Sequence, residues 1–293
     1  MRSIFEGCGT ALITPFDETG VNYDVLDNLI EDQIKGEVDA IIVCGTTGES
    51  ATMSKEEKKN VIKYVIDKVS GRCKVIAGTG SNNTLDAINM SKYAEEAGAD
   101  GVLVVTPYYN KATQRGLIEH YTNIASSISI PLIMYNVPSR TGVNINPETC
   151  LELSKIDNIV AIKEASGNMS QVVKIASMCK DNLDIYSGND DQIVPILSVG
   201  GKGVISVLSN VMPKYVHDMV ISYINGDKDS SMRMQLEAID LINSLFIEVN
   251  PGPVKYALNL MGYDVGIPRL PLTVPNDDNK KTIEKSLKKN KLI

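Results

Sequence analysis

The amino-acid sequence predicts an α/β protein, a (β/α)8 TIM barrel with a small C-terminal all-helical appendage. Short apolar runs typical of buried parallel strands alternate with longer amphipathic segments. The alternation occurs eight times within about 225 residues, close to the usual size of such a barrel. Beyond Gly226, helical patterns follow one another with no strand between them. We therefore expect a catalytic barrel over residues 1–225 and a helical domain over residues 226–293.

The eight expected strands are four or five residues long and several are almost wholly apolar, as in parallel strands covered on both faces. In chain order they are Thr10–Ile13, Ala40–Cys44, Lys74–Ala77, Gly101–Val105, Pro131–Tyr135, Ile159–Lys163, Leu183–Tyr186 and Gly203–Ser206.

Helices are expected between these strands because start and stop signals frame the amphipathic segments. Ser54, with Glu57 three residues later, forms a capping box, and Asn146-Pro147 places proline in a first helical turn. Glycines such as Gly98 follow helical segments, as they commonly do at C-termini. The clearest expected helices are Lys55–Val69, Thr84–Glu96, Pro147–Leu153, Ser231–Val249, Val254–Met261 and Asn279–Lys289.

A doubly wound sheet is the alternative fold, but its glycine-rich turn after the first strand is missing. Thr14-Pro15-Phe16 stands at that place. The nearest match elsewhere, Gly78-Thr79-Gly80, has Asn83 where the third glycine belongs.

The composition argues against several classes of binding partner and site. With 29 Lys and Arg against 36 Asp and Glu, the net charge of −7 is no footprint for nucleic acid or an anionic membrane. No apolar run approaches the roughly 18 residues of a membrane span, and the first nine residues lack the apolar centre of a signal peptide. Five scattered cysteines and two histidines disfavour a disulfide framework or a metal site. We expect a cytoplasmic protein without metal, nucleic-acid or membrane partners.

Barrel enzymes carry their chemistry where the strands end. The segments that follow the expected strands bring hydroxyls, phenols, a lysine and an arginine to one rim: Thr46, Thr47, Tyr109, Tyr135, Arg140 and Lys163.

Lys163 is the most informative of these residues. Strand alternation places Ala161 and Lys163 on one face, and Val160 and Ile162 on the other. Because the surrounding helices need the β-branched face, Lys163 is expected to point into the barrel. Burial would lower its pKa and leave a neutral amine able to form a Schiff base with a carbonyl substrate. A buried Lys–Glu ion pair explains the position equally well, so the position alone leaves both possibilities open.

The neighbouring side chains each have an ordinary explanation as well. Tyr135 could shuttle protons or be a core tyrosine, and Thr46 and Thr47 could relay a proton or shape a turn. Arg140 could clamp a carboxylate through its guanidinium fork or form a surface salt bridge. Together with an amine, however, they compose one coherent site for a carbonyl substrate.

Five motifs carry a resemblance that covers essentially the whole chain. They are Gly9–Ala11 with Thr14–Phe16, Gly45–Ser50, Pro107–Lys111, Tyr135–Gly142 and Ile162–Gly167. On these residues the chain resembles the dihydrodipicolinate synthase family, which belongs with N-acetylneuraminate lyase to the pyruvate-dependent class I aldolases. Arg140, within Pro138–Gly142, favours the synthases over the lyases.

The resemblance implies a 4-hydroxy-tetrahydrodipicolinate synthase, which condenses pyruvate with L-aspartate 4-semialdehyde at the committed step of lysine and diaminopimelate biosynthesis. It implies that Lys163 forms the Schiff base and that Tyr135, Thr46 and a neighbouring subunit's copy of Tyr109 relay protons. The implied substrate contacts come from Thr47, Arg140, and the backbones of Gly188 and Ile205. The family uses no metal or organic cofactor and usually forms a homotetramer of two tight dimers.

The resemblance also places a feedback site for lysine. The matching positions are Ser50, Ala51, Lys55, Lys58, Asn82, Asp86 and Tyr108. Lysine-sensitive members carry a non-cationic residue where Lys58 stands, and a second cation here would repel the cationic effector. We expect weak or absent inhibition by lysine.

Two other functions remain as alternatives. One is a sister aldolase acting on a sugar acid, such as an N-acetylneuraminate or 2-keto-3-deoxygluconate lyase, against which Arg140 argues. The other, of a different class, is a catalytically silent barrel that only binds keto acids.

Overall fold

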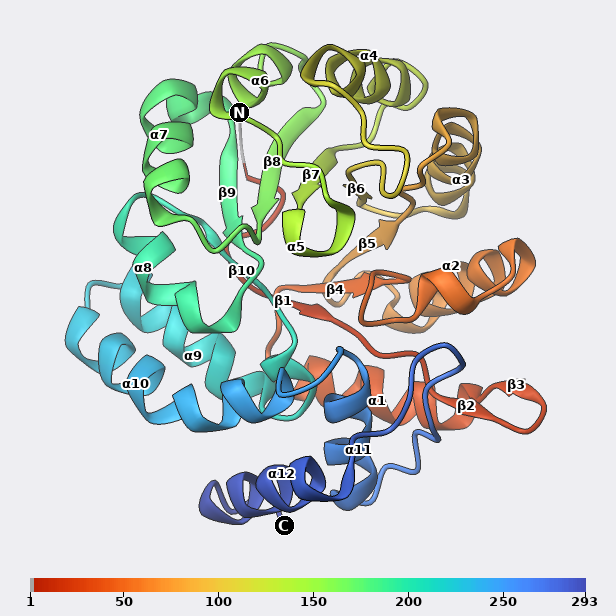
Figure 1. The fold of residues 1–293 in the computed structure, drawn as a ribbon, viewed down its shortest axis with the longest axis vertical. Coiled ribbons are helices and arrows are strands. Elements are labelled where there is room, and N and C mark those ends of the chain that lie inside the picture. The colour runs from red at the N-terminus through yellow and green to blue at the C-terminus, as the bar shows by residue number, and fades with distance from the viewer. Residues whose placement is uncertain (1–2) are drawn as a thin grey trace.

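A closed barrel of eight parallel strands forms the centre of the computed structural model, which describes residues 3–293 (Figure 1). In chain order each barrel strand pairs with the next, beginning with β1 and β4, and the last strand, β10, pairs with β1 to close the barrel. The strands are β1 (Gly7–Ala11), β4 (Ala40–Val43), β5 (Lys74–Gly78), β6 (Gly101–Val105), β7 (Leu132–Asn136), β8 (Ile159–Glu164), β9 (Asp184–Ser187) and β10 (Gly203–Ser206). The predicted fold is thereby confirmed.

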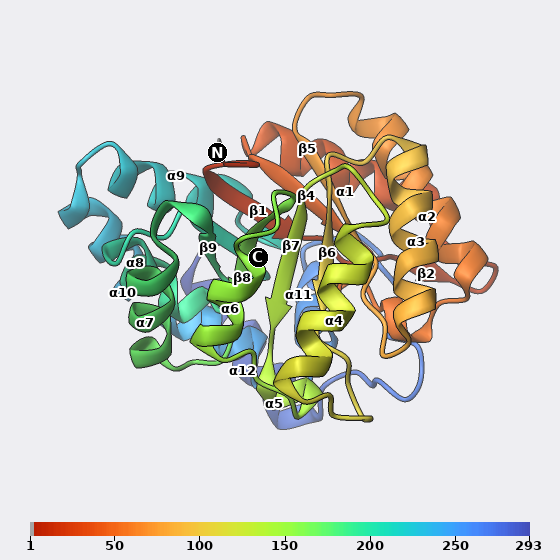
Figure 2. The same cartoon turned by 90° about the horizontal axis from the view of Figure 1, so that it is seen from above.

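Helices surround the barrel, as the view from above also shows (Figure 2). Those of the barrel are α1 (Tyr23–Lys35), α2 (Lys55–Val69), α3 (Thr84–Ala97), α4 (Gln114–Ala125), α5 (Pro138–Thr141), α6 (Pro147–Leu153), α7 (Met169–Cys179), α8 (Ile193–Ser198) and α9 (Pro213–Ile224). Short 3-10 turns join some of them: η1 (Ser50–Thr52), η2 (Lys180–Asn182), η3 (Asp190–Gln192) and η4 (Leu208–Asn210). The predicted helices over Lys55–Val69 and Pro147–Leu153 have the predicted bounds.

Three further helices follow the barrel: α10 (Lys228–Leu245), α11 (Gly252–Leu260) and α12 (Asp277–Lys289). Helix α10 buries Ala238, Leu241, Ile242 and Leu245, and these side chains belong to the same apolar cluster as the outer face of the barrel. The appendage is therefore helical, as predicted, and shares the core of the barrel.

The first strand differs from the prediction. Strand β1 starts at Gly7 and ends at Ala11, whereas the apolar run indicated Thr10–Ile13. Glycine weakens a strand prediction, yet here it is required by close packing. A Cβ atom on Gly7 would lie 1.9 Å from the Asp39 carboxylate, and one on Gly9 would lie 2.8 Å from Ile42.

A two-stranded hairpin, β2 (Phe16–Asp17) with β3 (Gly20–Val21), was not predicted. Its strands are two residues long, too short for an apolar pattern to indicate them.

Two apolar layers position the site. An outer cluster lies between strands and helices, and a smaller inner cluster fills the barrel, including Ile42, Ile133, Ala161 and Ile205. Ala161 and Ile162 lie in the inner and outer clusters respectively, as strand alternation predicts.

The prediction for Val160 was wrong, because this residue packs against the inner cluster. The pairing between β7 and β8 shifts register there, from Leu132–Ile159 to Ile133–Ala161. Val160 is therefore unpaired on the β7 side, and an irregularity of this kind locally interrupts strand alternation.

Two features are absent from the described residues. Over residues 3–293, no helix is long and apolar enough to cross a membrane. Within the same range, no group of three or more His, Cys, Asp and Glu side chains is arranged to hold a metal ion.

Candidate active site

Lys163 lies near the carboxyl end of β8, with its side chain inside the barrel. It is 5% exposed, and its ammonium nitrogen lies 4.4 Å from the centroid of the Tyr135 ring. Burial lowers the pKa of Lys163 from 10.5 to about 7, the Arg140 guanidinium contributes in the same direction, and Asp190 opposes the shift. A substantial fraction of this amine is therefore neutral at physiological pH.

The alternative of a Lys–Glu ion pair does not describe this structure. Glu164, the next residue, binds elsewhere: its carboxylate accepts from Asn136 Nδ2 at 2.9 Å and from the Ser166 backbone N–H at 2.7 Å. Among the described residues, no carboxylate forms an ion pair with the Lys163 ammonium, in contrast to the buried Lys255, which pairs with Glu49. Lys163 is thus free to react.

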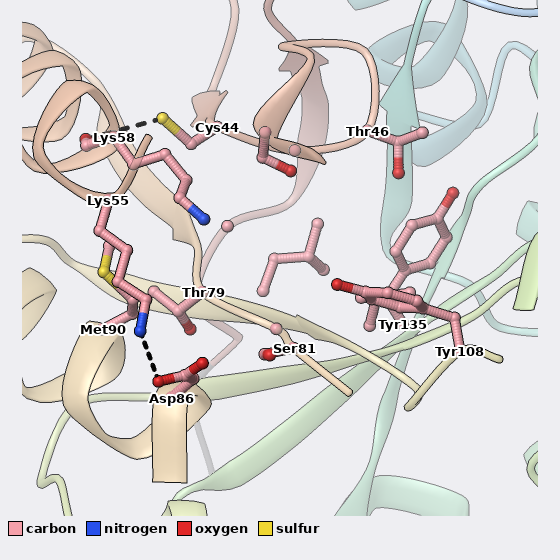
Figure 3. A pocket seen from close by; sticks show the side chains of 16 residues that line it. Cys44, Thr46, Lys55, Lys58, Thr79, Ser81, Asp86, Met90, Tyr108 and Tyr135 are labelled. Carbon is pink, nitrogen blue, oxygen red and sulfur yellow. Dashed lines mark hydrogen bonds and ion pairs between the residues drawn. The ribbon is translucent and has the colours of Figure 1, made fainter. Parts of the chain in front are cut away.

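Tyr135 pairs with Lys163 across the neighbouring strands β7 and β8. Burial raises the pKa of its phenol, while Arg140 and the hydroxyl of Thr46 act in the opposite direction. Figure 3 shows the Tyr135 hydroxyl turned towards Thr46. The predicted phenol and one predicted threonine are therefore neighbours, in position to pass a proton.

Thr46 and Thr47 follow β4 in a turn that reaches into the same cavity. Asn250 donates from Nδ2 to the Thr47 hydroxyl oxygen at 2.9 Å. Because the Thr47 oxygen accepts from Asn250, its hydroxyl hydrogen is left to donate to a ligand in the cavity. Asn250 was missed in the sequence, where Asn250-Pro251 between two helices has the composition of an ordinary turn.

Asp190 was also missed. Its Oδ2 accepts the backbone N–H groups of Val207 and Leu208 at 3.0 and 2.9 Å, which anchors the segment after β10. Its Oδ1 is buried with no hydrogen-bond partner among the described residues. Its carboxylate raises the Lys163 pKa and so opposes the effect of burial. In the sequence, Asp190 looked like part of a polar turn.

Of the two residues predicted to contact substrate through their backbones, Gly188 lines the cavity and Ile205 lies in the inner apolar cluster. Gly188 lines the cavity around Lys163, and a Cβ atom there would lie 2.7 Å from Ala165 Cβ and 3.1 Å from Lys163 Cε. Only glycine leaves room for the lysine at this position. Ile205 is fully buried in the inner cluster on β10, and its side chain is not among those that line the cavity.

Arg140 and Tyr109 are the outermost of the predicted residues. Arg140, on the short helix α5, lines both the cavity around Lys163 and the wider opening above it. Tyr109 is 91% exposed with a φ of +72° and does not line the cavity within this chain.

A second cavity, shown in Figure 3, shares Tyr135 and Thr46 with the cavity around Lys163. Five of the seven candidate effector residues line it: Ser50, Lys55, Lys58, Asp86 and Tyr108. Ala51 lines the adjoining opening, and Asn82 instead donates to the backbone oxygen of Tyr108 at 3.2 Å.

Charge within this second cavity is uneven. Lys55 is paired with Asp86 at 2.6 Å. The Lys58 ammonium points into the cavity in Figure 3, and no carboxylate of residues 3–293 forms an ion pair with it. The lining therefore carries one unbalanced positive charge.

Comparison with known proteins agrees with this geometry. The profile of the dihydrodipicolinate synthetase family matches residues 4–290. The chain is 56% identical over 291 residues to 4-hydroxy-tetrahydrodipicolinate synthase 1 of Clostridium acetobutylicum, covering 99% of each chain. It superposes on the dihydrodipicolinate synthase of Aquifex aeolicus with a TM-score of 0.96 and 45% identity, over 98% of this chain and 99% of that one. A synthase variant described as monomeric matches with a TM-score of 0.97 and 39% identity, over 99% of this chain and 98% of that one. The chain belongs to the dihydrodipicolinate synthetase family.

Proposed function

We propose that the chain catalyses the condensation of pyruvate with L-aspartate 4-semialdehyde, the reaction of a 4-hydroxy-tetrahydrodipicolinate synthase at the entry to lysine and diaminopimelate biosynthesis. The observation that carries the proposal is the unpaired, buried Lys163, whose pKa lies at about 7 beside a phenol and two threonines. Full-length relatives that bear the name of this enzyme support it.

The first half of the reaction uses the inner cavity. The neutral Lys163 amine attacks the keto carbon of pyruvate, and loss of water leaves an imine. Tyr135 supplies and removes the protons of these steps, with Thr46 as its neighbour in the relay. The Thr47 hydroxyl donates to the pyruvate carboxylate. Gly188 and Ile205 offer backbone groups to the bound substrate, and the missing side chain of Gly188 gives the imine space.

The second half joins the two substrates. Loss of a proton from the pyruvate methyl group converts the imine to an enamine, whose carbon attacks the aldehyde of the second substrate. Arg140 at the opening binds the carboxylate of that substrate, as its planar guanidinium suits. Because the product is a ring, the substrate's own amine then displaces Lys163. The covalent imine supplies the activation, so neither a metal nor an organic cofactor takes part.

We also propose a homotetramer built from two tight dimers, in which a neighbouring subunit's copy of Tyr109 completes the proton relay. The exposure of Tyr109 supports this, since a phenol that is 91% exposed in one chain is available to a partner.

Lysine is expected to inhibit weakly or not at all. The effector positions gather at the second cavity, and there the unpaired ammonium of Lys58 would lie near a cationic ligand.

Borohydride trapping tests the proposal directly. Reduction in the presence of pyruvate should add the pyruvate-derived mass to the peptide that contains Lys163. The Lys163→Ala variant should lose the adduct, and Lys155→Ala, which removes a surface lysine, should keep it. No adduct on the wild-type protein would exclude the Schiff base and favour a silent keto-acid-binding barrel.

A substrate comparison separates the synthase from a sister aldolase. The protein should consume pyruvate together with aspartate semialdehyde and should release no pyruvate from N-acetylneuraminate or 2-keto-3-deoxygluconate. Release from a sugar acid with no turnover of the semialdehyde would establish the lyase alternative instead.

A further inference from the structure

A fully buried ion pair joins the C-terminal appendage to the turn that carries Thr46 and Thr47. The Lys255 ammonium on α11 lies 2.7 Å from Glu49 Oε1, and the two side chains are 1% and 0% exposed. Buried ion pairs often stabilise a protein no more than apolar side chains of the same size would, because both charges lose their hydration. A pair of this kind therefore calls for a role other than stability.

Glu49 ends the turn and is held on both carboxylate oxygens. Its Oε2 accepts the backbone N–H of Arg269 at 2.8 Å, while its own backbone N–H donates to the Thr46 carbonyl at 3.1 Å. Its φ of +56° lies in the left-handed region, which is uncommon for glutamate. The buried side chain thus holds the backbone in a conformation that the residue does not prefer.

The preceding two residues are held as well. Thr47 accepts from Asn250 Nδ2 at 2.9 Å, and the Gly48 carbonyl accepts from the Thr14 hydroxyl at 2.8 Å. Two of these anchors, Asn250 and Lys255, come from the C-terminal segment and lie five residues apart. The turn that reaches into the cavity is therefore fixed largely by the appendage.

Lys255 and the neighbouring Arg269 are also held in place, by an aromatic ring and a second ion pair. Both the Lys255 ammonium and the Arg269 guanidinium lie over the ring of Phe16, at 4.3 and 3.9 Å from its centroid. Arg269 also pairs with Glu57 at 2.7 Å, so two cations face two carboxylates. With its partners in place, the Glu49 side chain has little freedom to move.

We propose that Lys255 and Glu49 are positioning residues of the reaction: their ion pair fixes the turn whose threonines contact pyruvate and the proton relay. Neither side chain lines the cavity around Lys163, so both act through Thr46 and Thr47. This inference rests on the proposed function and makes the C-terminal segment part of the active site.

The single variant Lys255→Met should lower kcat on the order of 10²-fold, the effect of a small misplacement of groups in an active site. Borohydride should still trap pyruvate on Lys163, since the amine itself is untouched. Lys289→Met is the matched control. It breaks a 2.6 Å lysine–aspartate contact between α12 and α10 whose side chains are 63% and 62% exposed, and it should leave kcat unchanged.

The double variant Glu49→Gln/Lys255→Met distinguishes positioning from stability. It leaves no unpaired buried charge, and the glutamine amide oxygen still accepts from the Arg269 N–H. We expect its Tm to return to near the wild-type value while kcat stays low and KM for pyruvate rises. Recovery of kcat to within about twofold of wild type, together with the Tm, would show a purely structural pair and overturn the proposal, as would a normal kcat for Lys255→Met.

Two further readouts keep the result unambiguous. If the double variant does not fold, Glu49→Gln alone is measured at a temperature where circular dichroism shows it native, and an unchanged kcat and KM there would contradict the inference. Failure of the proposed function looks different, because wild-type protein would then neither trap pyruvate nor consume the semialdehyde. Wild-type activity with equally active variants refutes only the positioning role.

Discussion

Lys163 shows how a single buried position prepares a side chain for chemistry. Removal from water destabilises the charged ammonium, and the Arg140 guanidinium adds repulsion, so the pKa falls to about 7. The negative charge of the Asp190 carboxylate favours the ammonium form and so limits the fall of the Lys163 pKa. A lysine with this pKa is nucleophilic near neutral pH, whereas an exposed lysine is almost wholly protonated there.

Replacing Lys163 by methionine should stabilise the fold and abolish turnover. The folded-state pKa lies below the unfolded value of 10.5, so between about pH 7 and 10.5 the unfolded chain holds a proton that the native state has released. Stability of the wild-type protein therefore rises with pH across this window, and the cost of burying the charge is fully present below it. Urea unfolding should show a gain of a few kcal/mol for Lys163→Met at neutral pH.

That gain should shrink as the pH approaches 10, because releasing the proton from the wild-type amine on folding then costs less free energy. A variant less stable than wild type at neutral pH would contradict the assigned cost. The wild-type rate should itself rise with pH through about 7 as the amine loses its proton.

Lys58 offers a second test at a single residue. The Lys58→Gln variant removes the unpaired cation from the second cavity, so L-lysine should inhibit the variant at a concentration roughly tenfold lower than wild type, if it inhibits wild type at all. Initial rates at increasing lysine concentration measure this, and Lys63→Gln, on an exposed part of the same helix, is the control. Sub-millimolar inhibition of the wild-type protein would refute the proposed insensitivity.

At the scale of elements, the segment from β4 to α2 contains both the turn that lines the candidate site and the start of a helix. The strand ends at Val43, the turn presents Thr46 and Thr47, and the helix begins behind a capping box in which Ser54 and Glu57 exchange hydrogen bonds. Arg269 pairs with Glu57 and holds the pKa of its carboxyl at about 2. One helix start is thereby tied to the C-terminal segment.

Loss of the cap should weaken this element without changing the chemistry. Ser54→Ala removes the hydrogen bond from the Glu57 N–H to the serine hydroxyl at 3.1 Å and should cost about 1 kcal/mol of stability. Thermal unfolding measures the loss, and Ser54→Thr, which keeps the hydroxyl, should restore most of it. A loss of kcat larger than the loss of stability accounts for would place Ser54 in the positioning network instead.

At the scale of the whole molecule, the site combines parts that are far apart in the chain. The closed barrel brings β4, β7 and β8 to one rim, and the segment after α10 adds Asn250 and Lys255 from behind the turn. The proposed tetramer would add Tyr109 from a neighbouring subunit. Barrel and appendage share one apolar cluster.

The Tyr109→Phe variant tests the intersubunit relay. It should lower kcat by about 10² to 10³-fold, within the usual range for loss of a proton-transfer group, and leave KM for pyruvate nearly unchanged. Mass measurement in solution should find the same assembly for variant and wild type. An isolated monomer with full activity would refute the contribution of the neighbouring subunit.

Truncation tests the proposed division at residue 226. A chain of residues 1–225 should fail to form an active, cooperatively folded barrel, because it exposes apolar surface that α10 covers and lacks the anchors of the Thr46–Thr47 turn. Thermal unfolding followed by circular dichroism, together with pyruvate trapping, measures both properties. A truncated chain that melts cooperatively and turns over substrate would show an independent catalytic domain.

The sequence alone predicted the barrel, the helices α2, α3, α6, α10, α11 and α12, and the central group of candidate site residues. Apolar runs and caps are local signals, and Lys163, Tyr135 and Thr46 stand where expected strands end, so local rules sufficed to place them on one rim. The family resemblance added the substrates and Tyr109.

Only the tertiary structure decided which of two possibilities holds at Lys163, and which distant residues support the turn. The lysine is unpaired because Glu164 turns to Asn136, and Val160 faces inward because the pairing shifts register. Asn250, Asp190, Glu49 and Lys255 have no local signal, since their partners are set by how the chain closes on itself. Such contacts depend on three-dimensional proximity between residues up to about 200 positions apart, which no local pattern encodes.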